Sequence, residues 1–195
     1  MVVAQTGIGN VNAAIVASTL INYFHPKWVI FSGVAGALQK NLNSSNVVIA
    51  TKTFDVNFGQ YTAKGNLFSL TSRNPVRNAV LPLEFESSQT LVQVAQRLAK
   101  KDPHVILGAI ATDQQFPSNS SKDPILVQHK IPAKAMEDSG IAQACWLFHT
   151  GFISIRAISD NIVTNQAYTE QSAEKAANKA SKTTIRFLHL LFSQK

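Results

Sequence analysis

Continuous apolar runs alternate along this chain with segments in which apolar residues recur at helical spacing. The apolar runs are typical of buried strands, and they lie at 28–31, 47–54, 105–111 and 152–158. Helical spacing indicates one helix that ends at His25-Pro26 and further helices over 90–101, 140–148 and 169–192. Strands that alternate with helices predict an α/β sandwich.

The first helix and the strand after it show the pattern most clearly. Val16, Leu20 and Phe24 recur at four-residue spacing with Ala13 and Ala17 beside them, so we expect these residues to form one face of the helix. The apolar run at 28–31 then meets Ser32-Gly33, which predicts a buried strand followed by a glycine-rich tip.

Two stretches lack a regular pattern. Residues 56–87 mix Gly, Asn, Pro and Arg, which predicts a long loop with irregular strand, and residues 117–122 predict a polar loop. Long loops within compact domains are often functional.

Composition narrows the class of protein. With 195 residues, 45% of them hydrophobic, the chain can form one domain with a sizeable core. No apolar run is long enough to predict a membrane span. The first ten residues lack the pattern of a signal peptide, and Cys145 is the single cysteine, so we expect a cytoplasmic protein in which Cys145 serves packing.

The formal net charge of +7 does not by itself indicate a nucleic-acid partner. Lysines and arginines are scattered, and the longest basic run has two residues, whereas nucleic-acid binders gather basic residues on one face. The five histidines are isolated and show no ligand spacing, so we expect neither a metal nor an organic cofactor.

Two carboxylates stand where chemistry is expected. Asp160 ends the apolar strand at 152–158, and Glu137 precedes the helix at 140–148. Open α/β sheets bind ligands outside the carboxyl ends of their strands. Two carboxylates at such ends can divide acid and binding roles if their surroundings separate their pKa values.

Three segments in a fixed order carry a family resemblance: TGIGNVNAA at 6–14, FSGVAGAL at 31–38, and AMEDSGIAQ followed by RAISD between 135 and 160. Together they resemble the nucleoside phosphorylase/nucleosidase superfamily, and within it they look most like bacterial 5′-methylthioadenosine/S-adenosylhomocysteine nucleosidases. The resemblance covers residues 1–195 as one domain and implies a three-layer αβα sandwich around a mixed, twisted sheet. It also implies hydrolysis of an N-glycosidic bond, which releases adenine and a 5-thioribose sugar, and a homodimer.

The resemblance assigns roles to individual residues. Asp160 matches the general acid that protonates the leaving base, and Arg156 matches the arginine that positions the attacking water. Ser159 matches a residue that holds Asp160 or the base edge. Glu137 matches the acceptor of the ribose hydroxyl groups, and Met136 would pack against the sugar.

The remaining matches concern the base and the sugar pocket. Phe116 matches the aromatic residue on which adenine stacks. The segment Val34-Ala35-Gly36 matches the small-residue tip that lines the site, and Phe58 is a candidate for the 5′-substituent pocket.

Each polar match has a plainer interpretation. Asp160 could cap a helix, Glu137 could serve a helix dipole, and Arg156 could form a buried ion pair. Phe116 could pack within its loop. Asp138 and Ser139 have the character of ordinary N-terminal helix residues.

The same tip favours a hydrolase over a phosphorylase. Phosphorylases of this superfamily bind phosphate with an arginine before the glycine and a serine after it, where this chain has Phe31 and Val34. A phosphate dianion buried there would lack partners, which is costly. Water is therefore the expected nucleophile.

The chain departs from the family pattern at three places. The family's general-base glutamate lies upstream of the segment that matches residues 1–10, so we expect roughly forty N-terminal residues and the first strands to be absent. Pro117 follows Phe116, where the family uses a backbone N–H to bind adenine, and proline has none. Val34 stands where nucleosidases usually have a small polar residue.

These departures leave three hypotheses for function. The first is an adenosyl-thioether nucleosidase. The second is a non-catalytic nucleoside-binding homologue that lacks the general base. The third is a purine nucleoside phosphorylase, whose activity would depend on phosphate.

Overall fold

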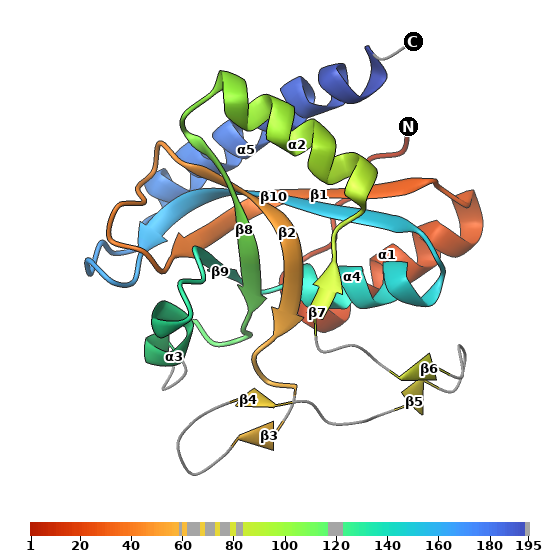
Figure 1. Cartoon of the computed structure of the whole chain (residues 1–195), viewed down its shortest axis with the longest axis horizontal. Helices are drawn as coiled ribbons and strands as arrows, with labels where there is room; N and C mark the ends of the chain where they lie inside the picture. Colours follow the sequence, from red (N-terminus) through yellow and green to blue (C-terminus); the bar gives the residue numbers. More distant parts are fainter. Residues whose placement is uncertain are drawn as a thin grey trace.

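A mixed β-sheet with helices on both faces forms the centre of the molecule in a computed structural model (Figure 1). The structure describes residues 1–58, 60–61, 67–68, 73–74, 79–80, 84–116 and 123–193. Its helices are α1 (Asn10–Phe24), α2 (Gln89–Lys101), α3 (Asp123–Gln128), α4 (Asp138–Leu147) and α5 (Glu170–Phe192). The main sheet contains β1 (Trp28–Ala37), β2 (Val47–Asp55), β7 (Glu84–Glu86), β8 (Val105–Thr112), β9 (Ala133–Ala135) and β10 (Gly151–Asn161).

The sheet curls until it closes on itself. Its strand order is β10-β1-β9-β8-β2-β7, and β10 also pairs with β2, so five strands form a ring. β1 and β10 run parallel, as do β2 and β8 and also β8 and β9, whereas β10 and β2 are antiparallel. A ring of five strands has a narrow interior. One buried cluster is accordingly rich in alanine: Ala35, Ala37, Leu42, Val48, Ala50, Ile110, Ala133, Ala135 and Ile158.

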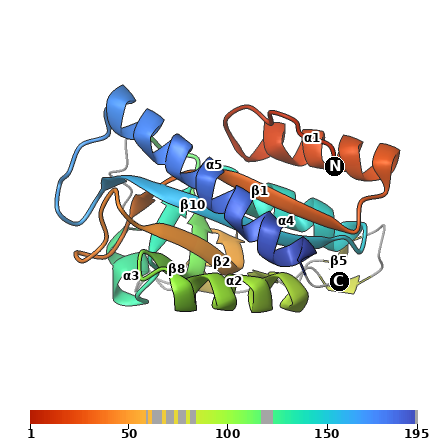
Figure 2. The ribbon, with the colours of Figure 1, turned by 90° about the horizontal axis from the view of Figure 1, so that it is seen from above.

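Helices cover the sheet in two layers (Figures 1 and 2). α2 and α5 pack with β1, β2, β8 and β10 around one apolar cluster, in which Leu91 and Phe187 are fully buried. α1 and α4 pack together, and Ala13, Ile141 and Phe152 belong to a second cluster. The arrangement confirms the predicted α/β fold with a helix layer on each face of a mixed sheet.

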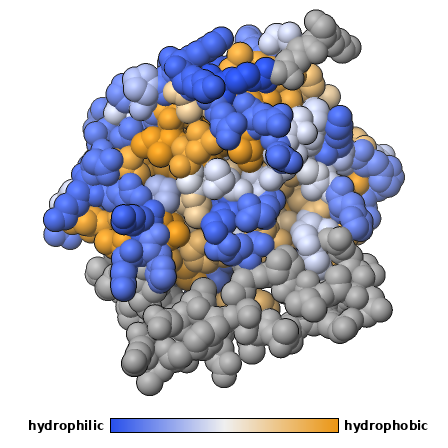
Figure 3. Space-filling model, viewed as in Figure 1, coloured by the Kyte–Doolittle hydropathy of each residue, from blue (hydrophilic) through white to orange (hydrophobic). Residues whose placement is uncertain are grey.

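The helices begin and end where local signals place them. Thr169 and Ser172 form a capping box at the start of α5. α1 ends at Phe24, and the next residue, His25, adopts the left-handed conformation and donates its N–H to the Ile21 carbonyl. Polar side chains are spread over the described part of the face seen in Figure 3, with apolar areas between them. No helix in the described part of the chain is long and apolar enough to cross a membrane.

Two expectations need correction. β1 continues through Ala37, so Val34-Ala35-Gly36 belongs to a strand and not to a tip after it. On α1, Ala13 and Ala17 of the predicted face are buried together with Ile21, but Phe24 is exposed, because α1 approaches α4 through small residues.

Two results concern short elements. The strand β9 was not predicted, because three residues are too few to show a period. The described residues of the stretch 56–87 include the short strand pairs β3 (Gln60–Tyr61) with β4 (Leu67–Phe68) and β5 (Arg73–Asn74) with β6 (Ala79–Val80), and then β7, which agrees with the irregular strand expected there. The polar loop expected at 117–122 lies outside the described residues. Cys145 is buried, and burial raises the pKa of its thiol to about 12, as expected for a packing residue.

Replacing Phe187 with alanine tests the α5 interface. Phe187 is fully buried against the sheet, so Phe187→Ala should lower the free energy of unfolding by about 3–5 kcal/mol. Ile185→Ala, on the exposed side of the same helix, should change it by about 0.5 kcal/mol or less. Urea denaturation of both variants measures the difference, and equal losses would contradict this packing.

Candidate active site

A cavity of about 280 Å³ is lined mainly by residues of β1, β9 and β10 and of the segments that follow β8, β9 and β10. It collects residues from distant parts of the sequence, because the sheet places these strands side by side, with β1 parallel to β10 and antiparallel to β9. The lining residues are Ile8, Val34, Ala35, Gly36, Asp113, Gln115, Phe116, Lys134, Ala135, Met136, Glu137, Arg156, Ser159, Asp160, Ile162 and Tyr168.

Arg156 forms the buried polar centre on one side of the cavity. Its Nε and Nη2 donate to the two carboxylate oxygens of Asp138 at 3.2 and 2.7 Å, and Nη2 also donates to Glu137 Oε2 at 2.9 Å. Nη1 donates to the Val34 carbonyl at 3.1 Å, and the guanidinium lies 4.2 Å from the centre of the Phe31 ring. Burial alone would lower the pKa of Arg156, but Asp138 and Glu137 together raise it, so the guanidinium stays charged.

The approach of Arg156 to β1 depends on Gly33. A Cβ at Gly33 would stand 2.5 Å from Arg156 Nη1. The absence of a side chain at Gly33 leaves the space that the Arg156 guanidinium occupies beside β1.

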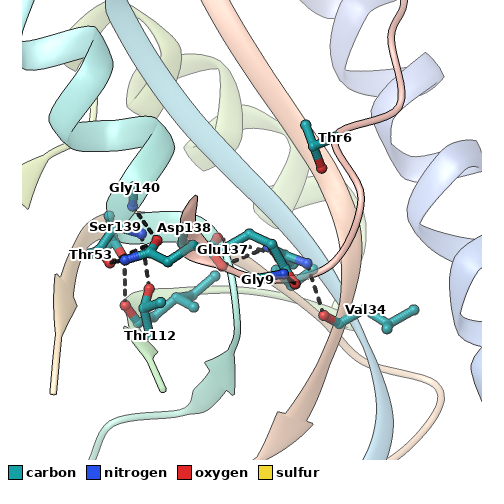
Figure 4. Close-up of polar contacts among 12 residues, drawn as sticks. Thr6, Gly9, Val34, Thr53, Thr112, Glu137, Asp138, Ser139 and Gly140 are labelled. Atoms are coloured by element: carbon teal, nitrogen blue, oxygen red, sulfur yellow. Dashed lines mark hydrogen bonds and ion pairs between the residues drawn. The ribbon is translucent and has the colours of Figure 1, made fainter. Parts of the chain in front are cut away.

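Glu137 is held from two directions (Figure 4). Its Oε1 accepts a hydrogen bond from the Gly9 N–H at 3.1 Å, while Oε2 is bound by Arg156. The start of α1 is tied to the start of α4 by Asn10, whose Oδ1 accepts from the Gly140 N–H at 2.5 Å. The orientation of Glu137 is therefore set by α1, α4 and β10 together.

Asp160 is the next-to-last residue of β10 and lines the cavity. The Ser159 hydroxyl donates to Asp160 Oδ1 at 2.6 Å. Burial raises the pKa of Asp160 above its ordinary value, although the Ser159 hydrogen bond and the Lys134 ammonium oppose the rise. A carboxyl in these surroundings keeps its proton to a higher pH than an exposed one, which suits a proton donor.

Lys134 and Asp113 form an ion pair that the sequence did not indicate. Lys134 Nζ lies 3.2 Å from Asp113 Oδ2, and the two residues are only 5% and 1% exposed. Burial raises the pKa of Asp113, but the Lys134 charge and the hydrogen bonds from Gln115 and Asn57 together bring it below its ordinary value. Both side chains line the cavity.

Two aromatic residues lie at its rim. Phe116 is 56% exposed, and its ring meets Tyr168 edge to face with 5.1 Å between ring centres. Tyr168 just precedes α5, so the pair joins the segment after β8 to the segment before the last helix. Exposed rings beside a cavity are available to contact a flat ligand.

The cavity brings together nine of the ten residues predicted for the site. They are Val34, Ala35, Gly36, Phe116, Met136, Glu137, Arg156, Ser159 and Asp160. Phe58 is not among the lining residues; it lies in the turn after β2, where its N–H donates to the Asp55 carbonyl. Pro117 lies outside the described residues.

Of the alternative structural roles for the polar residues, the structure shows the ion pair of Arg156 but no helix capping by Asp160 or Glu137. Asp160 lies inside β10 and caps no helix. Glu137 is the residue before α4, but its side chain caps nothing there and binds Arg156 and Gly9 instead. The ion pair expected as an alternative for Arg156 is present.

Asp138 is a correction to the sequence interpretation. It is fully buried and binds Arg156 through both oxygens, so it is no ordinary helix-start residue. Ser139 is also buried, with its N–H bonded to the Thr112 hydroxyl. Among the described residues, no group of His, Cys, Asp or Glu is arranged to hold a metal ion.

Comparison with known proteins decides the family. The model of the phosphorylase superfamily matches residues 1–192. The chain belongs to the phosphorylase superfamily.

Curated relatives and solved structures of this superfamily resemble the chain over most of its length. A 5′-methylthioadenosine/S-adenosylhomocysteine nucleosidase from Staphylococcus aureus (strain MRSA252) is 32% identical over 200 residues, which cover 100% of this chain and 82% of the relative. The nucleosidase of Geobacillus sp. (strain WCH70) is 35% identical over 82% of this chain and 67% of its own length. The crystal structure of the nucleosidase from Colwellia psychrerythraea in complex with adenine is 27% identical, with a TM-score of 0.76 over 96% of this chain and 76% of that one.

Replacing Asp138 with alanine tests the buried ion pair. Asp138→Ala leaves Arg156 with one carboxylate partner in a buried position, so the free energy of unfolding should fall by about 3–5 kcal/mol. Asp102 forms a pair of the same 2.7 Å length with Arg186 at the surface, and Asp102→Ala should cost about 1 kcal/mol or less. Chemical denaturation compares the two, and a small loss for Asp138→Ala would show that Glu137 alone satisfies Arg156.

Proposed function

We propose that this protein is a nucleosidase that hydrolyses the N-glycosidic bond of 5′-methylthioadenosine and S-adenosylhomocysteine, releasing adenine. The curated relatives are nucleosidases for these two nucleosides, which makes the chain an N-glycosyl hydrolase by family. The observation that carries the proposal is the placement of Asp160 and Glu137. A carboxyl with a raised pKa and a carboxylate held by Arg156 face one cavity from different strand ends.

In this proposal, Asp160 is the general acid. When the bond between C1′ and the base breaks, the bonding electrons move onto the base. The Asp160 carboxyl gives its proton to a ring nitrogen of the base and so prevents a build-up of negative charge there. The Ser159 hydroxyl, 2.6 Å from Oδ1, sets the orientation of the carboxyl.

Glu137 and Arg156 are proposed to act on the sugar side. A carboxylate held by Arg156 and the Gly9 N–H is a rigid acceptor for ribose hydroxyl groups, and such charge-assisted hydrogen bonds are strong. Arginine has five N–H groups. With described partners, Arg156 uses one on Nε, one on Nη1 and two on Nη2, which leaves one on Nη1 for the attacking water. Met136 lines the same part of the cavity and would pack against the sugar.

Water is the proposed nucleophile instead of phosphate. Phe31 occupies the position where a phosphorylase would present an arginine, and its ring packs against Arg156. Arg156 itself is already neutralised by Asp138 and Glu137. A phosphate dianion beside Arg156 would therefore meet the carboxylates that already neutralise it, which is unfavourable.

The base is proposed to lie at the rim beside Phe116. Stacking on an aromatic face holds a base without reading its identity. Tyr168, in edge contact with Phe116, would limit the width of the slot. Val34, Ala35 and Gly36 allow close approach because their side chains are small or absent.

Replacing Asp160 with asparagine tests the acid role. Asp160→Asn should lower the rate of adenine release from 5′-methylthioadenosine by about 10²–10⁴-fold, because the amide keeps the shape but gives no proton. In the unchanged protein, activity should fall as pH rises through the raised pKa of Asp160, since only the protonated acid is competent. Free adenine is followed with and without phosphate.

The same assay separates the alternatives. Dependence on phosphate would establish a phosphorylase and contradict the hydrolase proposal. Retained nucleoside binding with no release of adenine would support the non-catalytic homologue. The matched control is Asp102→Asn, at an aspartate that does not line the cavity, which should leave the rate unchanged.

We also propose that the enzyme is a cytoplasmic homodimer that serves methionine salvage. Ile8, Val11 and Ile15 are 74%, 66% and 60% exposed, and Val11 and Ile15 are one helical turn apart on α1. Exposed apolar patches mark interaction surfaces. Ile8 also lines the cavity, so a second copy that covers this patch would complete the rim of the site.

A charge placed in the patch tests the dimer. Ile15→Glu should shift the protein from dimer to monomer in sedimentation velocity, because a carboxylate cannot be buried without a partner. Ile185→Glu places the same charge at an exposed position of α5 and should leave the dimer intact. A monomeric unchanged protein would contradict the proposal.

A further inference from the structure

Three neighbouring strands present Asp160, Gly36 and Lys134 side by side. Gly36 pairs with Asp160 across the parallel β1–β10 ladder and with Lys134 across the antiparallel β1–β9 ladder. Directly paired residues point to the same face of a sheet. A Cβ at Gly36 would stand 2.9 Å from Asp160 Oδ2, so Asp160 occupies the space next to the missing side chain. Glycine thus leaves no side chain between a carboxyl group and an ammonium group.

Lys134 is firmly held in this row. Its Nζ lies 3.2 Å from Asp113 Oδ2, and Asp113 Oδ1 accepts hydrogen bonds from the Gln115 N–H and the Asn57 side chain. Lys134 is 5% exposed, and burying a charged pair is costly even when the two charges meet. Such a pair at a cavity wall is weak evidence for stability, so a role in the site itself becomes the better explanation.

Lys134 is not the only charged group near Asp160. The other titratable or charged groups lining the described cavity or bound to its lining are Asp113, Glu137, Asp138, Arg156 and Tyr168. Arg156 is bound to Glu137 and Asp138, so its charge is balanced locally. Lys134 is the cation that acts on Asp160, in opposition to burial.

We propose that Lys134, held by Asp113, is a positioning residue for the acid: its ammonium charge stabilises the Asp160 carboxylate that remains after the proton has passed to the leaving base. The inference rests on the proposed function, in which Asp160 is that acid. Lys134 acts through Asp160 and exchanges no proton itself.

The proton balance of the step is as follows. The C1′–N bond breaks and its electrons go to the base, which takes the Asp160 proton. Water supplies the hydroxyl group at C1′ and releases one proton to solvent, and one solvent proton later restores Asp160. Between these events the cavity holds an extra negative charge on Asp160, and the fixed charge of Lys134 faces it without reorganisation.

Burial and Lys134 therefore have complementary effects. Burial favours the protonated form of Asp160 before the reaction, and Lys134 lowers the cost of the ionised state after it. The pKa of Asp160 is raised by burial, and the Lys134 charge opposes that rise.

The test follows the titration of Asp160 directly. Protein with ¹³C-labelled aspartate carboxyl groups is titrated by NMR, and the Asp160 signal is assigned by its loss in Asp160→Asn. Lys134→Met should move the Asp160 titration upward by roughly one pH unit. Asp113→Asn should move it downward, because the Lys134 charge is then less neutralised. The double variant removes both charges and should titrate close to the unchanged protein.

Kinetics give a second readout. In Lys134→Met, kcat should fall about tenfold at low pH, and the alkaline limb of its pH profile should move upward with the NMR titration. Lys134→Gln also removes the charge but can keep a hydrogen bond to Asp113, so it should give the same shift. It replaces Lys134→Met if the methionine variant folds poorly. Lys52→Met removes a lysine from the exposed pair with Glu84 on β2 and should shift neither readout.

Opposite shifts for Lys134→Met and Asp113→Asn support the positioning role, since loss of packing would not change sign. Unchanged or equally directed titrations in folded variants would overturn it. Activity that survives in Asp160→Asn would instead refute the proposed function, and the NMR shifts would then still report whether Lys134 acts on Asp160.

Discussion

One buried cation organises the polar side of the site. Arg156 lies inside the fold, where an unpaired charge is not tolerated, so Asp138 and Glu137 must both reach it from the start of α4. That requirement sets where α4 begins relative to β10. The Val34 carbonyl and the Gly9 N–H complete the arrangement and bring β1 and the segment before α1 to the same place. Pairing of one guanidinium thus ties four parts of the chain together.

Two glycines of β1 make room for the charged side chains of the site. Gly33 and Gly36 in β1 leave room for the Arg156 guanidinium and the Asp160 carboxyl, each of which approaches closer than a Cβ would allow. The charges separate into two groups, Arg156 with its two carboxylates and Lys134 with Asp113. Asp160 is partly buried beside the second group, whereas Glu137 is bound by Arg156 in the first, so the surroundings of the two carboxyl groups differ.

Much of the fold and most of the site could be predicted from the sequence. The long strands and helices have clear periods, and the order of TGIGN, SGVAG and RAISD marked the residues that line the cavity. Asp138 and Lys134 were missed for a physical reason. A charged residue beside a helix start or in a short polar stretch is usually solvated, and only tertiary contacts can bury it. Phe58, in the turn after β2, is not among the residues that line the cavity.

The sequence by itself determined the element types, the family and the ends of the strands that carry Asp160 and Gly36, because these follow from local periodicity and from motif order. Tertiary structure decided which charges pair. The closure of β10 onto β2, the insertion of β9 between β1 and β8, and the burial of Arg156 depend on contacts between residues far apart in the chain. Such contacts leave no period in the sequence, since a buried ion pair is specified by two distant positions and by the space between them.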